Sequence, residues 1–158
     1  MEPLTDIESI KRLGLAMAAG LILGFERESA DKPAGVRTFM LVCEGAALFM
    51  LCGLLISNQL AAENRISDPG RIASTVIQGI GFIAAGVILT RGSQIVGLTT
   101  AAAIWVTAAI GLLIGAGFTV LGLGATAITV VSLYLLRDVG RNASDTRPPD
   151  SPQAGKQG

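Results

Sequence analysis

The sequence predicts an all-α membrane protein, a polytopic bundle of about five transmembrane helices. Of its 158 residues, 51% are apolar and only 15% are charged, and the mean hydropathy is +0.60. A soluble domain carries about 25% charged residues. Only six charged residues fall between positions 38 and 136. Because a spanning helix needs about 20 apolar residues, this middle region is long enough for several crossings.

The first two predicted helices differ in the length of their uncharged segments, and so in how well each matches a transmembrane span. The uncharged core of the first, residues 13–25, is shorter than a bilayer requires. A capping-box pattern from Thr5 to Glu8 begins the helix earlier, and Lys11 and Arg12 can extend outward to lengthen it. The second helix, residues 38–57, is interrupted only by Glu44.

The remaining helices are bounded by turn residues. Residues 72–89 form the third, entered through Asp68 and Pro69, where Asp can cap a helix and Pro suits its first turn. Residues 92–136 are free of charge and too long for one crossing, and the glycines at 115 and 117 divide them into helices over 98–117 and 118–136. A transmembrane domain over 1–137 is therefore predicted, followed by a disordered cytoplasmic tail over 138–158 that is too polar to bury a core.

The distribution of Lys and Arg predicts the orientation. With the N-terminus outside and five spans, eight basic residues lie on the inner side and four on the outer side. Cytoplasmic loops carry the excess of basic residues. We therefore expect an inner-membrane protein with a cytoplasmic C-terminus.

Composition excludes several classes of function. The formal net charge is zero and histidine is absent, so the sequence has no basic field for nucleic acid and no imidazole for acid-base catalysis or metal binding. Two cysteines are too few for a structural zinc site. We expect no enzyme, no cofactor and no nucleic-acid partner, with Mg²⁺ possible as a ligand or a transported ion.

Small residues are concentrated in the predicted spans, where they let helix backbones approach each other. Packing within the bundle is one interpretation, and a homodimer seam is the other. Glycines of the third span would also let backbone carbonyls face a cavity. The glycines assigned to helix packing are Gly20, Gly24, Gly79, Gly81, Gly86, Gly111 and Gly115.

Glu44 is the only charged residue within the second span. It lies about 10 Å along the helix from Arg37, and a charge at this depth costs about 2.5–3.5 kcal/mol on insertion scales. It is either a cation or proton site in the bundle interior, or a protonated side chain bonded to a neighbouring helix. By depth, its expected neighbours are Gly20 and Gly24, with Arg27 or Arg37 nearer the surface.

The loop after the first helix carries acidic and basic residues around a Pro/Gly turn. Pairs of opposite charge could clamp the ends of the first two helices, or the loop could simply be solvated. The carboxylates Glu26, Glu28 and Asp31 are candidates for holding a hydrated Mg²⁺, which needs few protein oxygens. Elsewhere, Thr99 and Thr100 are expected to cap the fourth helix.

Five blocks of the sequence resemble the MgtC/SapB family of bacterial inner-membrane proteins. They are GLILGFERE at 20–28, AGVRTFMLV at 34–42, GAALF at 45–49, DPGRIASTVIQGIGFIAAGVIL at 68–89 and GLTTAAAIWVTAAIG at 97–111. The resemblance implies five spans, a cytoplasmic C-terminus and a link to magnesium homeostasis, adaptation to low Mg²⁺ and often virulence. It leaves open whether such proteins transport magnesium or regulate another membrane protein.

The polar residues that match the family's pattern are candidates for function. The sequence departs from the pattern at Phe39, Glu44 and Val96, so Glu44 is a weaker guide to the function of the family. Longer members carry a soluble C-terminal domain, where this sequence has only a short tail. The matching residues are Glu26, Arg27, Arg37, Thr38, Asp68, Arg71, Thr99 and Thr100.

Two hypotheses follow for what the protein does. The first is a non-enzymatic regulator or adaptor that acts through helix contacts with other membrane proteins. The alternative is a transporter or channel subunit for Mg²⁺ or another cation, using Glu44 and the glycine-rich third helix.

Overall fold

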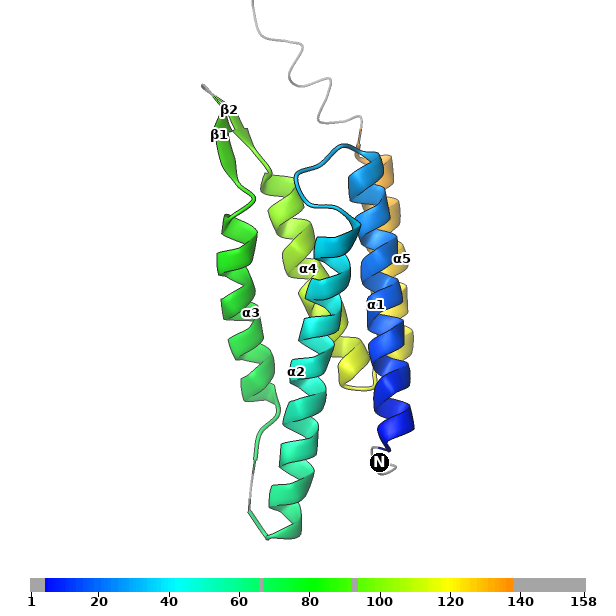
Figure 1. The fold of residues 1–158 in the computed structure, drawn as a ribbon, viewed down its shortest axis with the longest axis vertical. Coiled ribbons are helices and arrows are strands. Elements are labelled where there is room, and N and C mark those ends of the chain that lie inside the picture. The colour runs from blue at the N-terminus through cyan, green and yellow to red at the C-terminus, as the bar shows by residue number, and fades with distance from the viewer. Residues whose placement is uncertain (1–4, 66, 92–93, 138–158) are drawn as a thin grey trace, which may run out of the picture.

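The computed structural model describes residues 5–65, 67–91 and 94–137, and these form a bundle of five α-helices with one short β-hairpin (Figure 1). The predicted all-α class is therefore confirmed. The tail predicted for residues 138–158 lies outside the described residues. The elements are α1 (Asp6–Ser29), α2 (Val36–Ala62), α3 (Gly70–Ala85), β1 (Leu89–Arg91), β2 (Gln94–Val96), α4 (Leu98–Gly115) and α5 (Thr119–Leu135).

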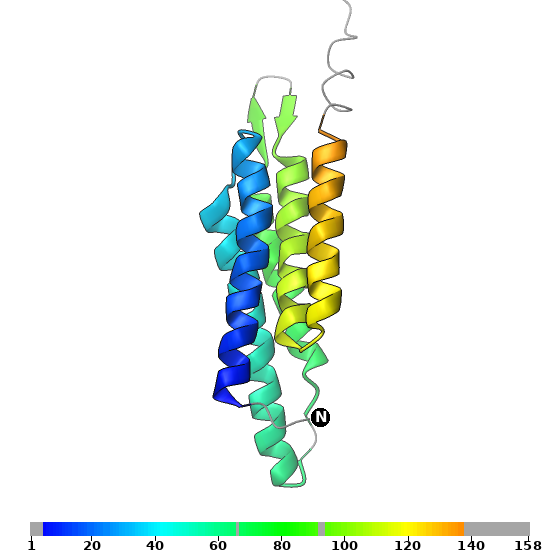
Figure 2. The same ribbon diagram turned by 90° about the vertical axis from the view of Figure 1, so that its right-hand side faces the viewer.

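Successive helices run in opposite directions along the bundle (Figure 1). Helix α2 lies centrally and packs mainly on α1 and α4, while α5 lies beside α4 and α1 (Figure 2). Helix α3 flanks the bundle and contacts α4 more than α2. Two helices, α2 and α4, are long and apolar enough to cross a membrane. We call the end that carries the β-hairpin the hairpin end.

Helix boundaries mostly follow the local signals in the sequence. Thr5 caps α1, with its Oγ1 3.3 Å from the backbone nitrogen of Glu8. Oδ1 of Asp68 accepts a 2.8 Å hydrogen bond from the N–H of Gly70, but Pro69 precedes the first helical residue instead of occupying the first turn. The predicted break between α4 and α5 is present, with Gly117 at a φ of +95°.

The predicted third span was too long at its C-terminal end. Helix α3 ends at Ala85, and Leu89 begins a strand in which Leu89, Thr90 and Arg91 pair with Val96, Ile95 and Gln94. Several β-branched residues occur here, and such side chains favour strands over helices. A turn at Gly86 and Val87, followed by the start of the hairpin at Leu89, therefore replaces the last turn of the expected helix.

Gly97 joins the hairpin to α4 in a conformation that only glycine adopts easily. Its φ is +93°, and a Cβ added there would lie 2.0 Å from the carbonyl oxygen of Val87. Both facts exclude a larger residue. The direction in which α4 leaves the hairpin thus depends on this glycine.

Four glycines lie where helices touch backbone to backbone. A Cβ at Gly20 would lie 2.5 Å from the carbonyl oxygen of Phe39, and one at Gly111 would lie 2.2 Å from that of Cys43. Gly24 and Gly115 meet the α2 backbone equally closely. Here the small residues serve packing within the bundle.

The glycines of α3 are different. A Cβ at Gly79 or Gly81 would meet no atom within 4 Å, and one at Gly86 would approach only carbonyls of its own helix. The predicted role in helix packing therefore does not hold for Gly79 and Gly81 within this chain. The reason is that α3 lies at the edge of the bundle and buries only Ile80 and Ala84.

Candidate functional site

A buried ion pair lies near the C-terminus of α1. Only 3% of the Arg27 side chain is exposed, and its Nε donates to Oε2 of Glu26, whose side chain is 10% exposed. The other carboxylate oxygen of Glu26, Oε1, is buried without a hydrogen-bond partner among the described residues. Leaving a buried acceptor unpaired costs about 1–3 kcal/mol, and more when it is charged.

Glu28 links α1 to the start of α2. Its Oε2 accepts a 2.9 Å hydrogen bond from the N–H of Val36, and so it caps a helix whose own N-cap residue, Gly35, has no side chain to offer. A Cβ at Gly35 would lie 2.5 Å from this oxygen. Glycine therefore leaves room for the carboxylate, whose hydrogen bond to Val36 holds the end of α1 to the start of α2.

The three carboxylates suggested for Mg²⁺ do not come together. Glu26 is held by Arg27 and Glu28 by the backbone of α2, while Asp31 is exposed in the following turn. In the part of the chain that the structure describes, no three acidic or cysteine side chains are arranged to hold a metal ion.

Glu44 is half-buried on α2 and forms no ion pair with any described residue. Glu44 is not among the residues that come closest to Gly20 and Gly24, which were its expected neighbours. The space at Gly20 is filled by Phe39, Met40 and Cys43, and that at Gly24 by Gly35 and Val36, because α1 crosses α2 on the face that carries Cys43.

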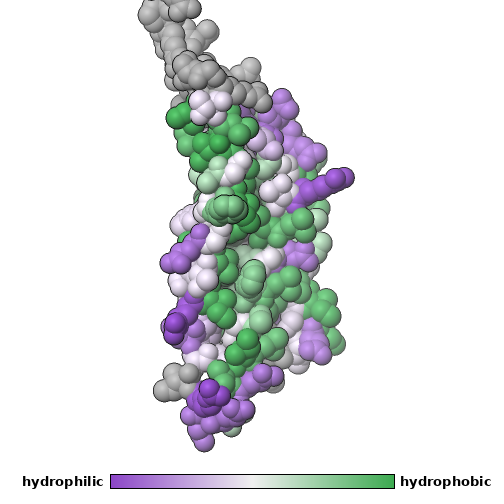
Figure 3. All heavy atoms as spheres, turned by 60° about the vertical axis from the view of Figure 1, so that its left-hand side comes forward, coloured by the Kyte–Doolittle hydropathy of each residue, from purple (hydrophilic) through white to green (hydrophobic). Residues whose placement is uncertain are grey.

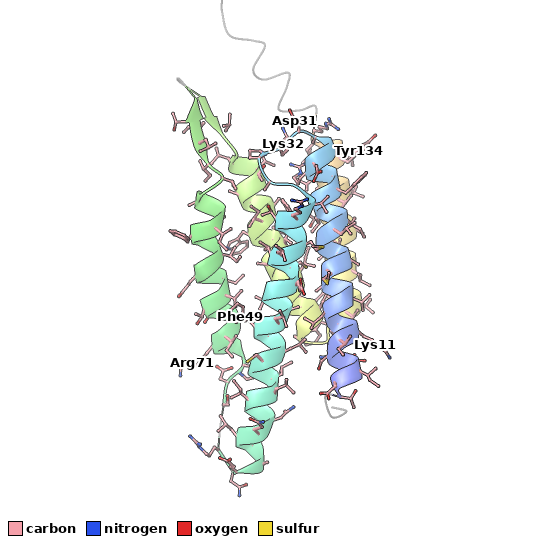
Figure 4. All side chains as sticks on the ribbon, in the orientation of Figure 1. Lys11, Asp31, Lys32, Phe49, Arg71 and Tyr134 are labelled. Atoms are coloured by element: carbon pink, nitrogen blue, oxygen red, sulfur yellow. The ribbon has the colours of Figure 1, made fainter. Side chains whose placement is uncertain are left out.

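The family-matching residues separate into two groups. Asp68 and Arg71 lie at the end opposite the hairpin, as the label of Arg71 shows (Figure 4). The others belong to segments at or near the hairpin end, where Arg37 is exposed and Thr38 half-buried. Neither Thr99 nor Thr100 caps α4, because the helix begins at Leu98 and Gly97 is its N-cap.

A cavity of about 660 Å³ opens at the hairpin end, between the α1–α2 loop and the start of α4. We call it the α4 N-terminal cavity. Asp31 and Lys32, labelled in Figure 4, lie on its loop side. Its lining residues are Asp31, Lys32, Pro33, Leu89, Ile95, Val96, Gly97, Leu98, Thr99 and Thr100.

A second hollow, of about 650 Å³, lies between α2 and α3 and is almost entirely apolar. We call it the α2–α3 groove. Phe49 and Ile83 are among the residues that line it, together with two glycines, Gly45 and Gly79. On this side of the molecule, apolar residues form a band along the length of the surface, with hydrophilic residues along both edges and at the lower end (Figure 3).

Sequence reasoning missed the role of Arg12. Its NH1 donates to the carbonyl oxygen of Gly115 at 3.2 Å, and its Nε pairs with Glu8 at 3.1 Å. A cation at this position stabilises the C-terminus of α4, where carbonyls lack partners. The Glu8–Arg12 spacing could have indicated the ion pair, but no local signal points to a carbonyl 103 residues away.

Lys32 was also overlooked as a lining residue. From the sequence, Lys32 is one basic residue of a solvated loop. Only in the folded chain does that loop lie beside the start of α4.

Comparison with known proteins identifies the family. Residues 13–142 match the MgtC family. Over 133 residues the chain is 47% identical to a protein of Escherichia coli K12 named "Putative magnesium transporter YhiD", covering 84% of this chain and 62% of YhiD. It is 40% identical to Protein MgtC of Salmonella typhimurium 14028s over 84% of this chain and 54% of MgtC. It is also 42% identical to Protein SrpB of Synechococcus elongatus, over 77% of this chain and 71% of SrpB.

The chain thus spans between about half and two thirds of the length of YhiD and MgtC. No solved structure matches it. The match over residues 13–142 covers most of the chain. The apolar helices α2 and α4 are consistent with a membrane protein. This chain belongs to the MgtC family.

Proposed function

We propose that the protein is a non-enzymatic regulator of magnesium homeostasis in the bacterial inner membrane, which acts through helix contacts with a membrane partner. Membership of the MgtC family and the printed name of YhiD support the link to magnesium. The distribution of basic residues supports a periplasmic N-terminus and a cytoplasmic C-terminus.

The α2–α3 groove is the observation that carries the regulatory role. Neighbouring helices already occupy the space beside four glycines, Gly20, Gly24, Gly111 and Gly115. In the groove, by contrast, the space where a Cβ would lie is open at Gly45 and Gly79. In lipid, small residues are what allow a second helix to approach closely. The groove is therefore suited to a transmembrane helix of the partner.

Filling the groove tests this role. Gly79→Phe places a large side chain in the groove at a position where an added Cβ meets no atom within 4 Å, and Gly14→Phe does the same at an equally open position on α1, outside the groove. In cells that lack the chromosomal copy, we expect Gly79→Phe to abolish growth in low Mg²⁺ while Gly14→Phe supports it, at equal amounts in the membrane. Normal growth with Gly79→Phe would contradict the role of the groove.

Transport of Mg²⁺ or another cation is the second candidate. It is favoured by the printed name of YhiD and by Glu44, a carboxylate half-buried within an apolar helix, since ionisable groups inside a membrane commonly mark ion pathways. This function requires that the purified protein moves Mg²⁺ by itself and that the movement depends on Glu44.

A further inference from the structure

The face of α3 that points away from the bundle carries a stripe of small and polar residues. Helix α3 packs on α4 and α2 and lies at the margin of the bundle, so no other described element covers this face (Figure 1). The stripe recurs at alternating intervals of four and three residues, which is the spacing of the contact seam between two coiled helices. We call it the α3 outer stripe, and its members are all exposed: Ser74, Gln78, Gly81 and Ala85.

The amide of Gln78 is the polar group of this stripe that the chain does not pair. The hydroxyls of Ser74 and Thr75 each donate to the carbonyl oxygen of Arg71, at 2.8 and 2.9 Å. The side chain of Gln78 makes no hydrogen bond to a described residue.

The depth of Gln78 makes this unpaired amide costly. At 1.5 Å per residue, Gln78 lies about 12 Å from the start of α3, a helix of 16 residues and so about 24 Å long. The amide is therefore halfway along the helix, where a bilayer offers no water to hydrogen-bond with it. A hydrogen-bond partner from a second molecule would remove the cost.

The α3 outer stripe is distinct from the α2–α3 groove. The groove is lined on its α3 side by residues such as Thr75, Gly79 and Ile83, and by none of the four residues of the stripe. A helix bound in the groove and a molecule bound at the stripe would therefore contact different faces of α3.

A second copy of the chain fits the stripe because the stripe is complementary to itself. A primary amide both donates and accepts, so two Gln78 side chains can hydrogen-bond reciprocally. Copies inserted in one orientation place their α3 helices parallel, about a two-fold axis along the membrane normal. In a parallel pair each seam position faces the same position of the other helix. Gly81, where an added Cβ meets no atom within 4 Å, allows the two backbones to approach.

The residues that border the stripe agree with this arrangement. Phe82 is 86% exposed and adjoins the stripe, where it would cover the second helix. Arg71 continues the stripe in the first turn of α3, at the end of the helix, where water and salt screen its charge. We propose that two copies of the chain form a parallel dimer through the α3 outer stripe, with the two Gln78 amides paired at its centre. The proposal rests on the placement of α3 in a membrane and not on the regulatory role of the groove.

Disulfide cross-linking of the full chain in bacterial membranes tests the geometry. The two native cysteines are first replaced by Cys43→Ala and Cys52→Ala. Upon mild oxidation, Gly81→Cys in this background should give a covalent dimer, because equivalent seam positions face each other. Gly124→Cys is the matched control, since a Cβ there also meets no atom within 4 Å but the residue lies on α5. It should remain monomeric.

Sedimentation equilibrium of the purified full chain in detergent tests the role of the amide. Gln78→Leu removes the amide at similar size and should weaken the dimer about tenfold, as for an interhelical hydrogen bond between polar residues. Gln78→Asn keeps an amide and should lose less. Gly81→Leu should weaken the dimer at least as much as Gln78→Leu, whereas Gly124→Leu should dimerise as the parent does. These residues are exposed, and the midpoint of thermal unfolding verifies that each variant is folded.

Three results would overturn the proposal. They are a parent that stays monomeric at every concentration, cross-linking of Gly124→Cys as fast as that of Gly81→Cys, and a Gln78→Leu dimer as tight as that of the parent. Gly79→Phe fills the groove and should leave the dimer intact, so loss of the dimer in this variant would also contradict the stripe. Its growth in low Mg²⁺ is measured separately, and the roles of the groove and the stripe can therefore fail independently.

Discussion

Individual glycines decide how closely the helices of this bundle approach. Gly111 on α4 and Gly124 on α5 are both in helices, but a Cβ at Gly111 would lie 2.2 Å from the carbonyl oxygen of Cys43, whereas one at Gly124 meets nothing within 4 Å. The sequence pattern alone cannot separate the two cases, because the difference depends on which face of a helix meets its neighbour.

Substituting these two glycines by alanine should have opposite effects. Gly111→Ala forces α2 and α4 apart and should lower the free energy of unfolding by about 1–3 kcal/mol. Gly124→Ala should raise it by up to about 1 kcal/mol, since alanine favours a helix over glycine. Unfolding of the purified protein by titration with a denaturing detergent measures both. Equal effects of the two substitutions would contradict the packing at Gly111.

Arg12 should contribute to stability through the carbonyl that it caps. Because its side chain is only 17% exposed, we expect Arg12→Ala to lower the free energy of unfolding by about 1–2 kcal/mol. The adjacent Lys11 is exposed, and Lys11→Ala should change the same quantity by less than about 0.5 kcal/mol. The same denaturation assay compares them, and a loss for Lys11→Ala as large as that for Arg12→Ala would count against the cap.

For the helices, the sequence correctly predicted those boundaries that depend on interactions between residues close together in the chain. The Thr5 cap and the break before α5 follow from side chains that act within one turn of their own position. The hairpin could not be predicted in this way, since a short apolar run such as residues 86–89 is compatible with either the end of a helix or a strand. Only its pairing with residues 94–96 resolves the choice.

The junction between the hairpin and α4 should depend strictly on Gly97. Gly97→Ala introduces a Cβ at 2.0 Å from the carbonyl oxygen of Val87 and disfavours the φ of +93°, at a cost of about 1–3 kcal/mol for the backbone alone. Hydrogen exchange should become faster in β1, β2 and the first turn of α4. Gly45→Ala adds the same methyl group at an open position, and its exchange pattern should match that of the parent.

If Gly97→Ala left the exchange of β1 and β2 unchanged, the close contact with Val87 would be wrong. A uniform increase over all five helices would instead indicate that the hairpin supports the whole bundle.

For the whole molecule, alternating helix directions place both the α1–α2 loop and the C-terminus of α5 at the hairpin end (Figure 1). Helices α3 and α5 have 16 and 17 residues, or about 24–26 Å at 1.5 Å per residue, slightly short of a 30 Å hydrocarbon core. Thinning of the bilayer around the molecule would accommodate them at modest cost.

The orientation of the bundle is predicted by its basic residues. A reporter fused after Arg137 should be active in the cytoplasm, and one inserted at Asn64, in the loop that follows α2, should be active in the periplasm. These positions lie at opposite ends of the bundle. A periplasmic signal after Arg137 would contradict the five-span arrangement.

The candidate sites illustrate what sequence reasoning can and cannot reach. Glu26, Arg27 and Thr100 stand out in the sequence as polar residues of family-matching blocks. Their surroundings do not, because the burial of the Glu26–Arg27 pair and the cavity wall that includes Lys32 arise only once the helices have packed.

The central claim, that the protein regulates a partner and does not itself carry magnesium, is tested most directly by flux into proteoliposomes. The purified protein is reconstituted, and Mg²⁺ entry is followed with an enclosed Mg²⁺-sensitive dye against protein-free vesicles and vesicles with Glu44→Gln. A regulator should admit Mg²⁺ no faster than protein-free vesicles do. Entry well above that rate, lost in Glu44→Gln, would contradict the claim and establish transport.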